Sequence, residues 1–459
     1  MSIIIPANSA AGGGGFSVAN SCMFNSADTA SLSKTPSSNG SNTVWTVSMW
    51  VKRAGTAAGK LHAAGTSSTY EFLFDDTNFG LTLYNGSATI FVTSRSLKDS
   101  SSWYHIVLAY NTGASGTDKV KLFINGVQET SFATDNRSSA GTMNHINQNV
   151  VQYVGRTHAG GPFNGYLAEV CIIDGTAYAA SDFGEFDEDS GIWVPKDVSG
   201  LTFGTNGFYL DFKVSGNLGN DANGGTDLTE NNIAATDQAT DTCTNNFATV
   251  SSATPATGNL TYLRSGNLEL KQNNNPYAWP TTLVATTGKW YWEQKVSALG
   301  TTAVGVLKQD KFPQNGSLFY PFVQATGFAY KNTGNKGNNN NDSSYGASYT
   351  NDDILSVAFD QTNGTIWFAK NGAWQNSATK TEIENGTTTN SAFSSMSTNG
   401  EFYGPFIYTD GSTVVFSNFG NPFFAISSGN SDGNDFGNFE YEVPTGYFSL
   451  CSKNLAEFG

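Results

Sequence analysis

Cysteine, histidine and proline are all scarce in this chain. Its 459 residues include only 4 cysteines, 4 histidines and 12 prolines. The cysteines are too few and too far apart for a disulfide framework or a zinc site, so we expect buried free thiols. They are Cys22, Cys171, Cys243 and Cys451. The histidines form no close pair, which argues against a histidine-based metal centre.

Positive charge and long apolar runs are also lacking. Lys and Arg total 23 against 38 Asp and Glu, a formal net charge of −15, and no basic cluster occurs. Nucleic-acid binding through a basic face is therefore not expected. Apolar runs such as residues 402–408 are far shorter than the roughly 20 residues of a membrane-spanning helix. Residues 1–6 lack the basic start and long apolar stretch of a secretory signal, so we expect neither a membrane span nor export by that route.

Aromatic residues and glycine are abundant instead. Aromatic side chains make up 13% of the chain, as much as all charged side chains together, and there are 50 glycines. Disordered chains are poor in aromatics and rich in charge, so disorder over the full length is excluded. The chain is long enough for two or three domains with sizeable cores.

Short alternating strands dominate the pattern. Residues 119–127 alternate apolar and polar side chains up to Asn125-Gly126, a pair typical of tight hairpin turns. Residues 353–372 repeat this design, with one turn at Asn363-Gly364 and another at Asn371-Gly372. Helical periodicity is nearly absent. The sequence predicts an all-β protein made of two antiparallel β-sandwiches.

Composition suggests where these sandwiches begin and end. We expect an N-terminal arm at 1–20, one sandwich at 21–185, a polar connector over both domains at 186–250, and a second sandwich with a C-terminal extension at 251–459. The low-complexity segment 334–344 inside the second sandwich is predicted to be an exposed, mobile loop.

The first sandwich carries a recognisable series of strand motifs. The motifs are residues 45–52, 103–107, 122–126, 154–156 and 163–170. In order and spacing they resemble the laminin-G-like branch of the concanavalin A-like lectin/glucanase sandwiches. We expect Trp45, Trp50, Trp103 and Tyr104 to fill the space between its two sheets.

The second sandwich resembles a SPRY domain, another two-sheet sandwich. The motifs are residues 288–293, 303–306, 353–372, 405–406 and 415–420. The resemblance covers about residues 255 to 425. Beyond it, residues 447–455 are similar to the ending of SPRY domains in bacterial virus proteins.

The combination of both domains, with the segments 207–212 and 244–249 between them, resembles large structural proteins of tailed bacteriophages. The resemblance implies a virion protein assembled in the host bacterial cytoplasm, homo-oligomeric, and in contact with other virion proteins. The expected function is non-enzymatic: a tail-fibre or appendage subunit that binds host-surface polysaccharide or neighbouring virion proteins through sandwich loops. Two alternatives are a purely architectural capsid decoration or head-fibre protein and a polysaccharide-degrading enzyme.

One acidic run bears on the enzymatic alternative. Related glycanases place the carboxylates of a Glu-x-Asp-x-(x)-Glu strand on one face toward the sugar. The nearest match, residues 185–189, ends in Asp189 and lies at the domain end, so we expect a solvated turn. Nucleophile elbows, phosphate loops and zinc-protease motifs are missing. No catalytic residue is predicted, and Glu185 is the residue to test.

Sugar binding usually needs exposed aromatic rings that stack on a pyranose, together with Asn or Asp side chains that bind its hydroxyls. Five aromatic residues on predicted loops are candidates for glycan or partner binding. They are Tyr277, Trp279, Trp374, Tyr345 and Tyr349. The alternative is that these rings belong to the core of the second sandwich.

Calcium is the one cofactor that the resemblance suggests, because laminin-G-like domains often hold it at a sandwich edge. Asp75, Asp76 and Asp174 are acidic residues near predicted strand ends, although they lack the dense spacing of an EF-hand loop. Ordinary turn carboxylates are the alternative. No other cofactor is expected.

The N-terminal arm suggests an assembly role. Ile3, Ile4 and Ile5 are β-branched, uncharged and close to a glycine run. Such a segment can add as a strand to the open sheet edge of another subunit. Disorder is the alternative.

Overall fold

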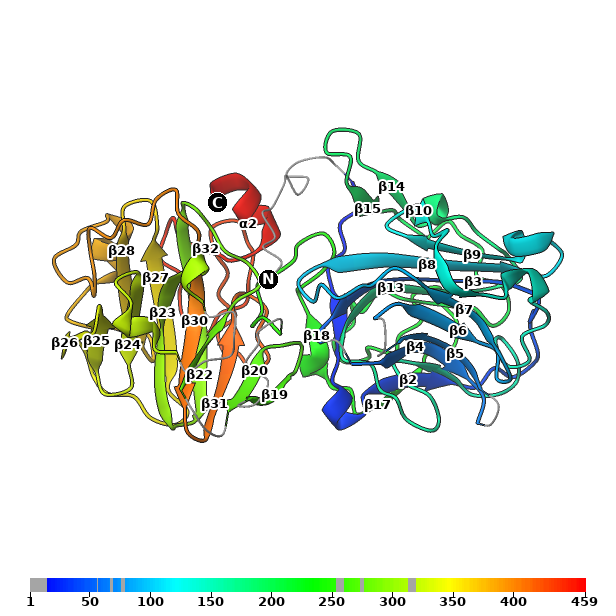
Figure 1. The fold of residues 1–459 in the computed structure, drawn as a ribbon, viewed down its shortest axis with the longest axis horizontal. Coiled ribbons are helices and arrows are strands. Elements are labelled where there is room, and N and C mark those ends of the chain that lie inside the picture. The colour runs from blue at the N-terminus through cyan, green and yellow to red at the C-terminus, as the bar shows by residue number, and fades with distance from the viewer. Residues whose placement is uncertain are drawn as a thin grey trace. The chain divides into compact units, whose positions relative to one another are not determined.

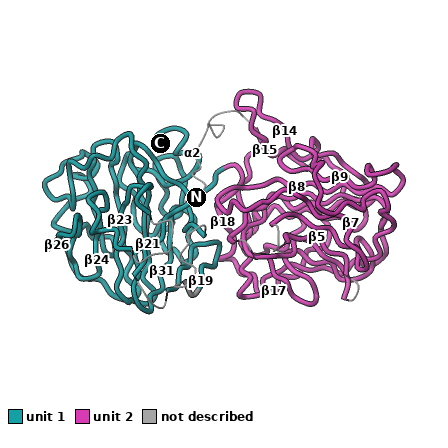
Figure 2. Tube along the Cα trace, in the orientation of Figure 1, with its two compact units in different colours: residues 1–11, 245–459 teal, residues 12–244 magenta. Residues whose placement is uncertain are grey.

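The computed structural model describes residues 15–55, 57–66, 69–75, 79–252, 260–272, 276–312 and 319–459. The predicted all-β class is confirmed, and the described chain forms two compact units (Figures 1 and 2). We call the unit that ends at Thr244 the N-unit and the one that begins at Asn245 the C-unit. Among the described residues, no helix is long and apolar enough to cross a membrane. Ile3, Ile4 and Ile5 lie outside the described residues.

The described part of the N-unit contains two antiparallel sheets of eight strands each. The first has β1 (Ser21–Phe24), β3 (Val44–Arg53), β8 (Trp103–Asn111), β9 (Val120–Ile124), β10 (Val127–Gln128), β13 (Gly165–Asp174), β16 (Phe208–Leu210) and β18 (Gln238–Ala239). The second has β2 (Ser31–Lys34), β4 (Gly59–Ala64), β5 (Tyr70–Phe74), β6 (Leu81–Tyr84), β7 (Thr89–Thr93), β11 (Phe132–Asp135), β12 (Gln152–Val154) and β17 (Thr229–Asn231). A separate hairpin pairs β14 (Gly184–Phe186) with β15 (Trp193–Pro195).

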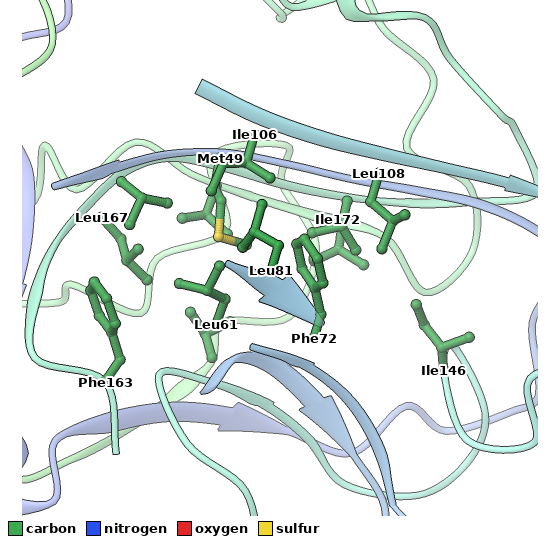
Figure 3. Close-up of a cluster of buried hydrophobic side chains, with 14 of the residues drawn as sticks. Met49, Leu61, Phe72, Leu81, Ile106, Leu108, Ile146, Phe163, Leu167 and Ile172 are labelled. Atoms are coloured by element: carbon green, nitrogen blue, oxygen red, sulfur yellow. The ribbon is translucent and has the colours of Figure 1, made fainter. Parts of the chain in front are cut away.

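The core of the N-unit lies between these two sheets (Figure 3). Alternate side chains of β3 and β8, such as Met49 and Ile106, meet Leu61, Phe72 and Leu81 from the opposite sheet. The period of two along each strand produces this layer. Burying such side chains stabilises the fold by about 1.5–3 kcal/mol each.

The alternation of side chains along a strand also shows that two of the four aromatic residues predicted to lie between the sheets do not lie there. Trp45 and Tyr104 contribute to the inter-sheet core. Trp50 lies an odd number of positions from Trp45, and Trp103 lies next to Tyr104, so both point to the opposite face of the sheet. That face is covered as well, and both rings are buried.

Residues 186–244 belong to the N-unit and not to a connector over both domains. Three strands of this segment extend the two sheets: β16 pairs with β13, β17 with β2, and β18 with β1. These strands have only two or three residues each. Their weak sequence pattern explains why the predicted domain boundary at 185 falls earlier than the structural one.

The described part of the C-unit also contains two large sheets. One has β19 (Leu260–Arg264), β20 (Glu269–Gln272), β22 (Lys289–Ala298), β27 (Ile354–Asp360), β28 (Thr365–Lys370), β29 (Ala373–Trp374), β31 (Thr413–Asn418) and β32 (Phe448–Ser449). The other has β21 (Tyr277–Pro280), β23 (Thr301–Lys308), β24 (Gly327–Lys331), β25 (Asn335–Asn338), β26 (Asn341–Ser344) and β30 (Tyr403–Asp410). Two short helices, α1 (Lys380–Glu384) and α2 (Ser452–Phe458), complete the described unit.

The predicted hairpins are confirmed. Asn125 and Gly126 have φ angles of 49° and 75° between β9 and β10. Asn371 and Gly372 have φ angles of 48° and 78° between β28 and β29. Two successive positive φ angles define the turn whose twist suits a two-residue hairpin.

Candidate ligand-binding surface

Four of the five predicted binding rings are buried. Tyr277 and Trp279 in β21 pack in a core cluster, and Trp279 Nε1 donates hydrogen bonds to Gln272 and Thr409. Tyr345 and Tyr349 pack against Tyr330, with ring centroids 5.6 and 5.4 Å away. These four rings cannot stack on a ligand, so the core alternative holds for them.

Trp374 is the fifth predicted ring, and it is half-buried. It packs against a core cluster that includes Tyr291 and Trp367. It therefore offers less free ring surface than a binding residue on an open loop would.

The asparagine-rich segment 334–344 is an ordered hairpin and not a mobile loop. β25 pairs with β26, and Asn338 lies opposite Asn341. Asn339 and Asn340 form the turn with φ angles of 50° and 56°. Asn is one of the few residues that tolerates a left-handed backbone, so the run of asparagines matches what this turn needs. The predicted exposure holds, because the turn and all of β26 are exposed.

This hairpin is held against a short aromatic segment. The 3-10 helix η7 (Pro321–Val323) precedes β24. The backbone N–H of Asn340 donates to the carbonyl of Phe322 (3.1 Å), and that of Asn339 donates to the carbonyl of Gln324 (3.2 Å). The Asn338 side chain donates to carbonyls of the same stretch, including that of Gly327 at 2.9 Å. The turn and η7 therefore form one continuous surface.

Tyr320, directly before η7, is the exposed aromatic residue of this surface. Its side chain is 38% exposed. Its ring centroid lies 5.8 Å from that of Tyr408 and 6.0 Å from that of Phe322. The rings of Tyr408 and Phe322 pack against Tyr320 and restrict its orientation. A restrained, partly open ring is suited to stacking because little side-chain entropy is lost on binding.

Unused hydrogen-bonding groups lie on the turn that is hydrogen-bonded to η7. Asn339, Asn340 and Asn341 are exposed, and within the described part of the chain their side-chain amides make no hydrogen bond. Each amide offers two donors and one acceptor oxygen. We call Tyr320 together with these three asparagines the aromatic–amide surface.

An ion pair borders the aromatic–amide surface. Lys331 Nζ lies 2.6 Å from Asp342 Oδ2 and 4.2 Å from the centroid of the Phe322 ring. Each charge is thus compensated locally. An aromatic ring with neutral amides and little net charge favours an uncharged, hydroxyl-rich ligand.

Tyr320 was missed by the sequence analysis although a signal is present. Phe319, Tyr320 and Phe322 surround Pro321 outside any alternating strand pattern. Proline fixes φ near the value of a helical first turn, and Pro321 begins η7. Aromatic residues gathered around a proline next to a strand are thus an indication of a shaped loop surface.

Two family models match the chain. Residues 25–180 match the laminin-G form of the concanavalin A-like lectin/glucanases superfamily, and residues 289–421 match the SPRY domain. The chain carries a laminin-G-like domain and a SPRY domain. The first lies in the N-unit and the second in the C-unit.

Similar solved structures contain SPRY domains. The SPRY domain of human HERC1 is 17% identical, with 34% of this chain and 90% of that chain covered and a TM-score of 0.27. A human SPRY domain is 18% identical, with 37% and 99% covered and a TM-score of 0.26. No curated protein sequence matches the chain.

The aromatic–amide surface lies in the SPRY domain, whereas the predicted calcium ligands lie in the laminin-G-like domain. The Asp174 carboxylate is buried and accepts hydrogen bonds from the backbone N–H groups of Ser41 (2.6 Å) and Asn206 (3.1 Å), as a turn carboxylate does. Asp75 follows β5, and Asp76 lies outside the described residues. Among the described residues, no three His, Cys, Asp or Glu side chains cluster as metal ligands would.

The acidic run of the N-unit has the geometry of a turn. Glu185 in β14 is exposed and forms an ion pair with Lys196 at 3.5 Å. The Asp187 carboxylate accepts hydrogen bonds from the N–H and the hydroxyl of Ser190, which lowers the pKa of Asp187. A glycosidase acid would need a raised pKa, which a hydrogen-bonded turn carboxylate does not have.

In a buried serine–histidine pair of the laminin-G-like domain, the hydrogen bond runs in the wrong direction to activate the serine as a nucleophile. Ser48 Oγ lies 3.0 Å from His105 Nε2, and Trp193 Nε1 lies 2.9 Å from His105 Nδ1. The indole N–H only donates, so Nδ1 accepts and Nε2 carries the proton. Burial lowers the pKa of His105 to about 3, which keeps the ring neutral. His105 therefore donates to Ser48 and cannot take its proton.

Proposed function

We propose that this protein is a non-catalytic adhesion protein that binds carbohydrate through the aromatic–amide surface of its SPRY domain. The observation that carries the proposal is the 38% exposed, ring-supported Tyr320, which directly precedes the short helix that is hydrogen-bonded to the asparagine turn. A ring that stacks on the apolar face of a sugar and amides that bind its hydroxyls are complementary to a neutral polysaccharide.

We further propose a role as a structural protein of a tailed-phage virion, in a tail fibre or appendage. The order of the laminin-G-like and SPRY domains and the phage-like ending at residues 447–455 support it. In this proposal, copies assemble in the bacterial cytoplasm and later present the aromatic–amide surface to host polysaccharide. Imaging of particles with this protein assigned discriminates a tail position from the capsid position that an architectural protein would take.

Carbohydrate binding is tested with the purified protein and bacterial surface polysaccharides. We expect Tyr320→Ala to weaken binding about 3- to 10-fold, because stacking contributes about 0.5–1.5 kcal/mol. Tyr320→Trp should retain binding. Asn340→Gly keeps the left-handed turn but deletes an amide, and it should also weaken binding. Calorimetric titration provides the affinities.

Tyr153→Ala is the matched control, because this half-buried tyrosine lies in the N-unit. Its affinity should equal that of the wild type. Equal affinities for wild type and Tyr320→Ala would refute the proposed surface. Release of reducing ends from polysaccharide, lost in Glu185→Gln, would instead establish the enzymatic alternative.

A further inference from the structure

A buried amine and a buried carboxylate meet inside the N-unit, although they lie far apart in the sequence. Lys52 is in β3, whereas Asp241 follows β18 near the end of the unit. Lys52 Nζ lies 2.6 Å from Asp241 Oδ2, and the two side chains are 1% and 0% exposed. An amine and a carboxyl group held this close together, away from bulk water, are the two groups from which an amide bond forms.

Two aromatic residues flank the Lys52 side chain. In the register of the sheet, Trp103 of β8 lies opposite Lys52 on one side and Tyr166 of β13 lies opposite it on the other. Residues that lie opposite one another share a face of the sheet, so the three side chains form one row. Lys52 Nζ lies 5.8 Å from the centroid of the Tyr166 ring, and the ring centroids of Trp103 and Tyr166 are 6.3 Å apart. This row restricts the position of the amine.

The two oxygens of the Asp241 carboxyl group have different neighbours. Trp103 Nε1 donates a hydrogen bond to Oδ1 at 3.0 Å, whereas Lys52 contacts Oδ2. The Ser21 hydroxyl donates to the backbone carbonyl of Asp241 at 2.7 Å, which fixes the main chain beside the pair. An N–H aimed at one oxygen stabilises the negative charge that develops there when a nucleophile adds to the carbon. Oδ1 is therefore suited to remain as a carbonyl oxygen, and Oδ2 is suited to leave.

Burial favours condensation of this pair over a lasting ion pair. Two charges inside a protein carry a desolvation cost that a neutral amide does not have. Groups held in the reactive geometry react with effective molarities of about 10⁵–10⁸ M, which offsets the low reactivity of a carboxyl group toward an amine. Exclusion of water also protects the product from hydrolysis.

We propose that Lys52 and Asp241 condense to an intramolecular isopeptide bond. A proton passes from the ammonium group to Oδ2, the neutral Nζ adds to Cγ, and the Trp103 N–H stabilises the charge on Oδ1. The Cγ–Oδ2 bond then breaks as Oδ2 takes a second proton from the nitrogen and leaves as water. The two protons that the nitrogen loses are those of the water, so no further reactant is needed. The neutral amide links β3 covalently to the end of the N-unit, independently of carbohydrate binding, which is assigned to the C-unit.

The intact mass of the full-length protein, measured under denaturing conditions, tests the bond. We expect the wild type to be lighter than its sequence by one water molecule, and Asp241→Ala to show no such deficit. After digestion with trypsin, fragmentation should identify two peptides joined through Lys52 and Asp241. A wild-type mass equal to that of its sequence would overturn the proposal, and this measurement does not depend on the folding of any variant.

The pair of Lys60 and Glu71 is the matched internal control. Its amine and carboxylate are 2.7 Å apart, but the side chains are 20% and 19% exposed. The corresponding peptides should stay separate, because water solvates both charges. A link at this pair as well would contradict the role of burial. A water loss that persists in Asp241→Ala would indicate a cyclic imide at another aspartate, and it would overturn the proposal too.

Trp103→Phe tests the role of the indole. Phenylalanine keeps an aromatic ring beside Lys52 and removes the N–H that donates to Oδ1. In freshly synthesised protein, the cross-linked fraction should rise more slowly than in the wild type, by on the order of 10² fold. A rise at the wild-type rate would refute the role assigned to Trp103.

Discussion

At the scale of single residues, a buried ion pair links the end of the N-unit to its sheet. Lys52 Nζ lies 2.6 Å from Asp241 Oδ2, with the side chains 1% and 0% exposed. Trp103 Nε1 donates to Asp241 Oδ1 at 3.0 Å. Charges are tolerated inside a protein when they are paired and hydrogen-bonded. Lys52 and Trp103 point away from the inter-sheet core, so Asp241 helps to cover the outer face of this sheet.

We predict that Asp241→Ala lowers the free energy of unfolding by about 3–5 kcal/mol, because the buried Lys52 loses its carboxylate partner. Urea unfolding measures the change. The control is Asp118→Ala, which removes an ion pair with Lys121 whose side chains are 66% and 39% exposed. Its effect should stay below about 1 kcal/mol. Similar effects of the two substitutions would contradict the prediction.

His62 makes the N-unit sensitive to acid. Within the described residues, neither ring nitrogen has a hydrogen-bond partner, and burial lowers the pKa of His62 from 6.5 to about 3. The unfolded chain takes up a proton near pH 6.5, whereas the folded one does so only near pH 3. Stability from this neutral histidine is therefore complete above pH 6.5 and is lost as the pH falls toward 3.

We predict that His62→Leu reduces the loss of stability between pH 6.5 and pH 3, because leucine cannot take up a proton. At pH 7 the variant should be as stable as the wild type within about 1–2 kcal/mol, since no hydrogen bond is removed. Urea unfolding at several pH values compares the two proteins. Parallel stability curves for variant and wild type would show that His62 is not the responsible group.

At the scale of elements, β13 contains a β-bulge that the alternation of apolar and polar residues in the sequence does not reveal. Its pairing with β3 shifts register between Ala168 and Cys171, and Glu169 has a φ angle of 49°. The extra residue of this bulge allows both Leu167 and Val170 to face the core. Burial raises the pKa of Glu169 to about 7, and its carboxylate accepts a hydrogen bond from Tyr209 in β16. A bulge of one residue leaves no distinct sequence signal.

The short strands β16, β17 and β18 determine at which residue the chain can be cut so that the N-unit still folds alone. We predict that a fragment of residues 15–244 folds, whereas a fragment ending at residue 185 does not unfold cooperatively. The shorter fragment exposes core residues that Phe208, Leu210 and Leu228 cover, and it lacks Asp241. Circular dichroism during heating compares the two. A cooperative transition in the fragment 15–185 would favour the boundary predicted from sequence.

At the scale of the whole molecule, both units are β-sandwiches, and the proposed carbohydrate-binding surface belongs to the C-unit. In a single copy, the aromatic–amide surface buries little more than one ring, so we expect weak affinity, roughly millimolar, by the energies of such contacts. Many copies on one particle raise the effective concentration and can strengthen attachment on the order of 10² to 10⁴ fold.

We predict that beads carrying many copies of the protein adsorb to host cells, whereas the free single copy is washed off. Adsorption should disappear on beads that carry Tyr320→Ala and persist on beads that carry Tyr153→Ala. Counting bound beads by microscopy measures the effect. A lack of adsorption by the multivalent wild type would speak for the architectural alternative.

The sequence alone determined the fold class, the hairpins at Asn125-Gly126 and Asn371-Gly372, and the two domain types. These features depend on local alternation and turn chemistry, which neighbouring residues carry. Only the tertiary structure decided that Trp279 and Tyr349 are buried and that Tyr320 is exposed. Burial depends on which segments cover a strand face, and those segments lie far away in the sequence, as Asp241 does from Lys52. The proposed binding surface therefore became visible only once the sheets were assembled.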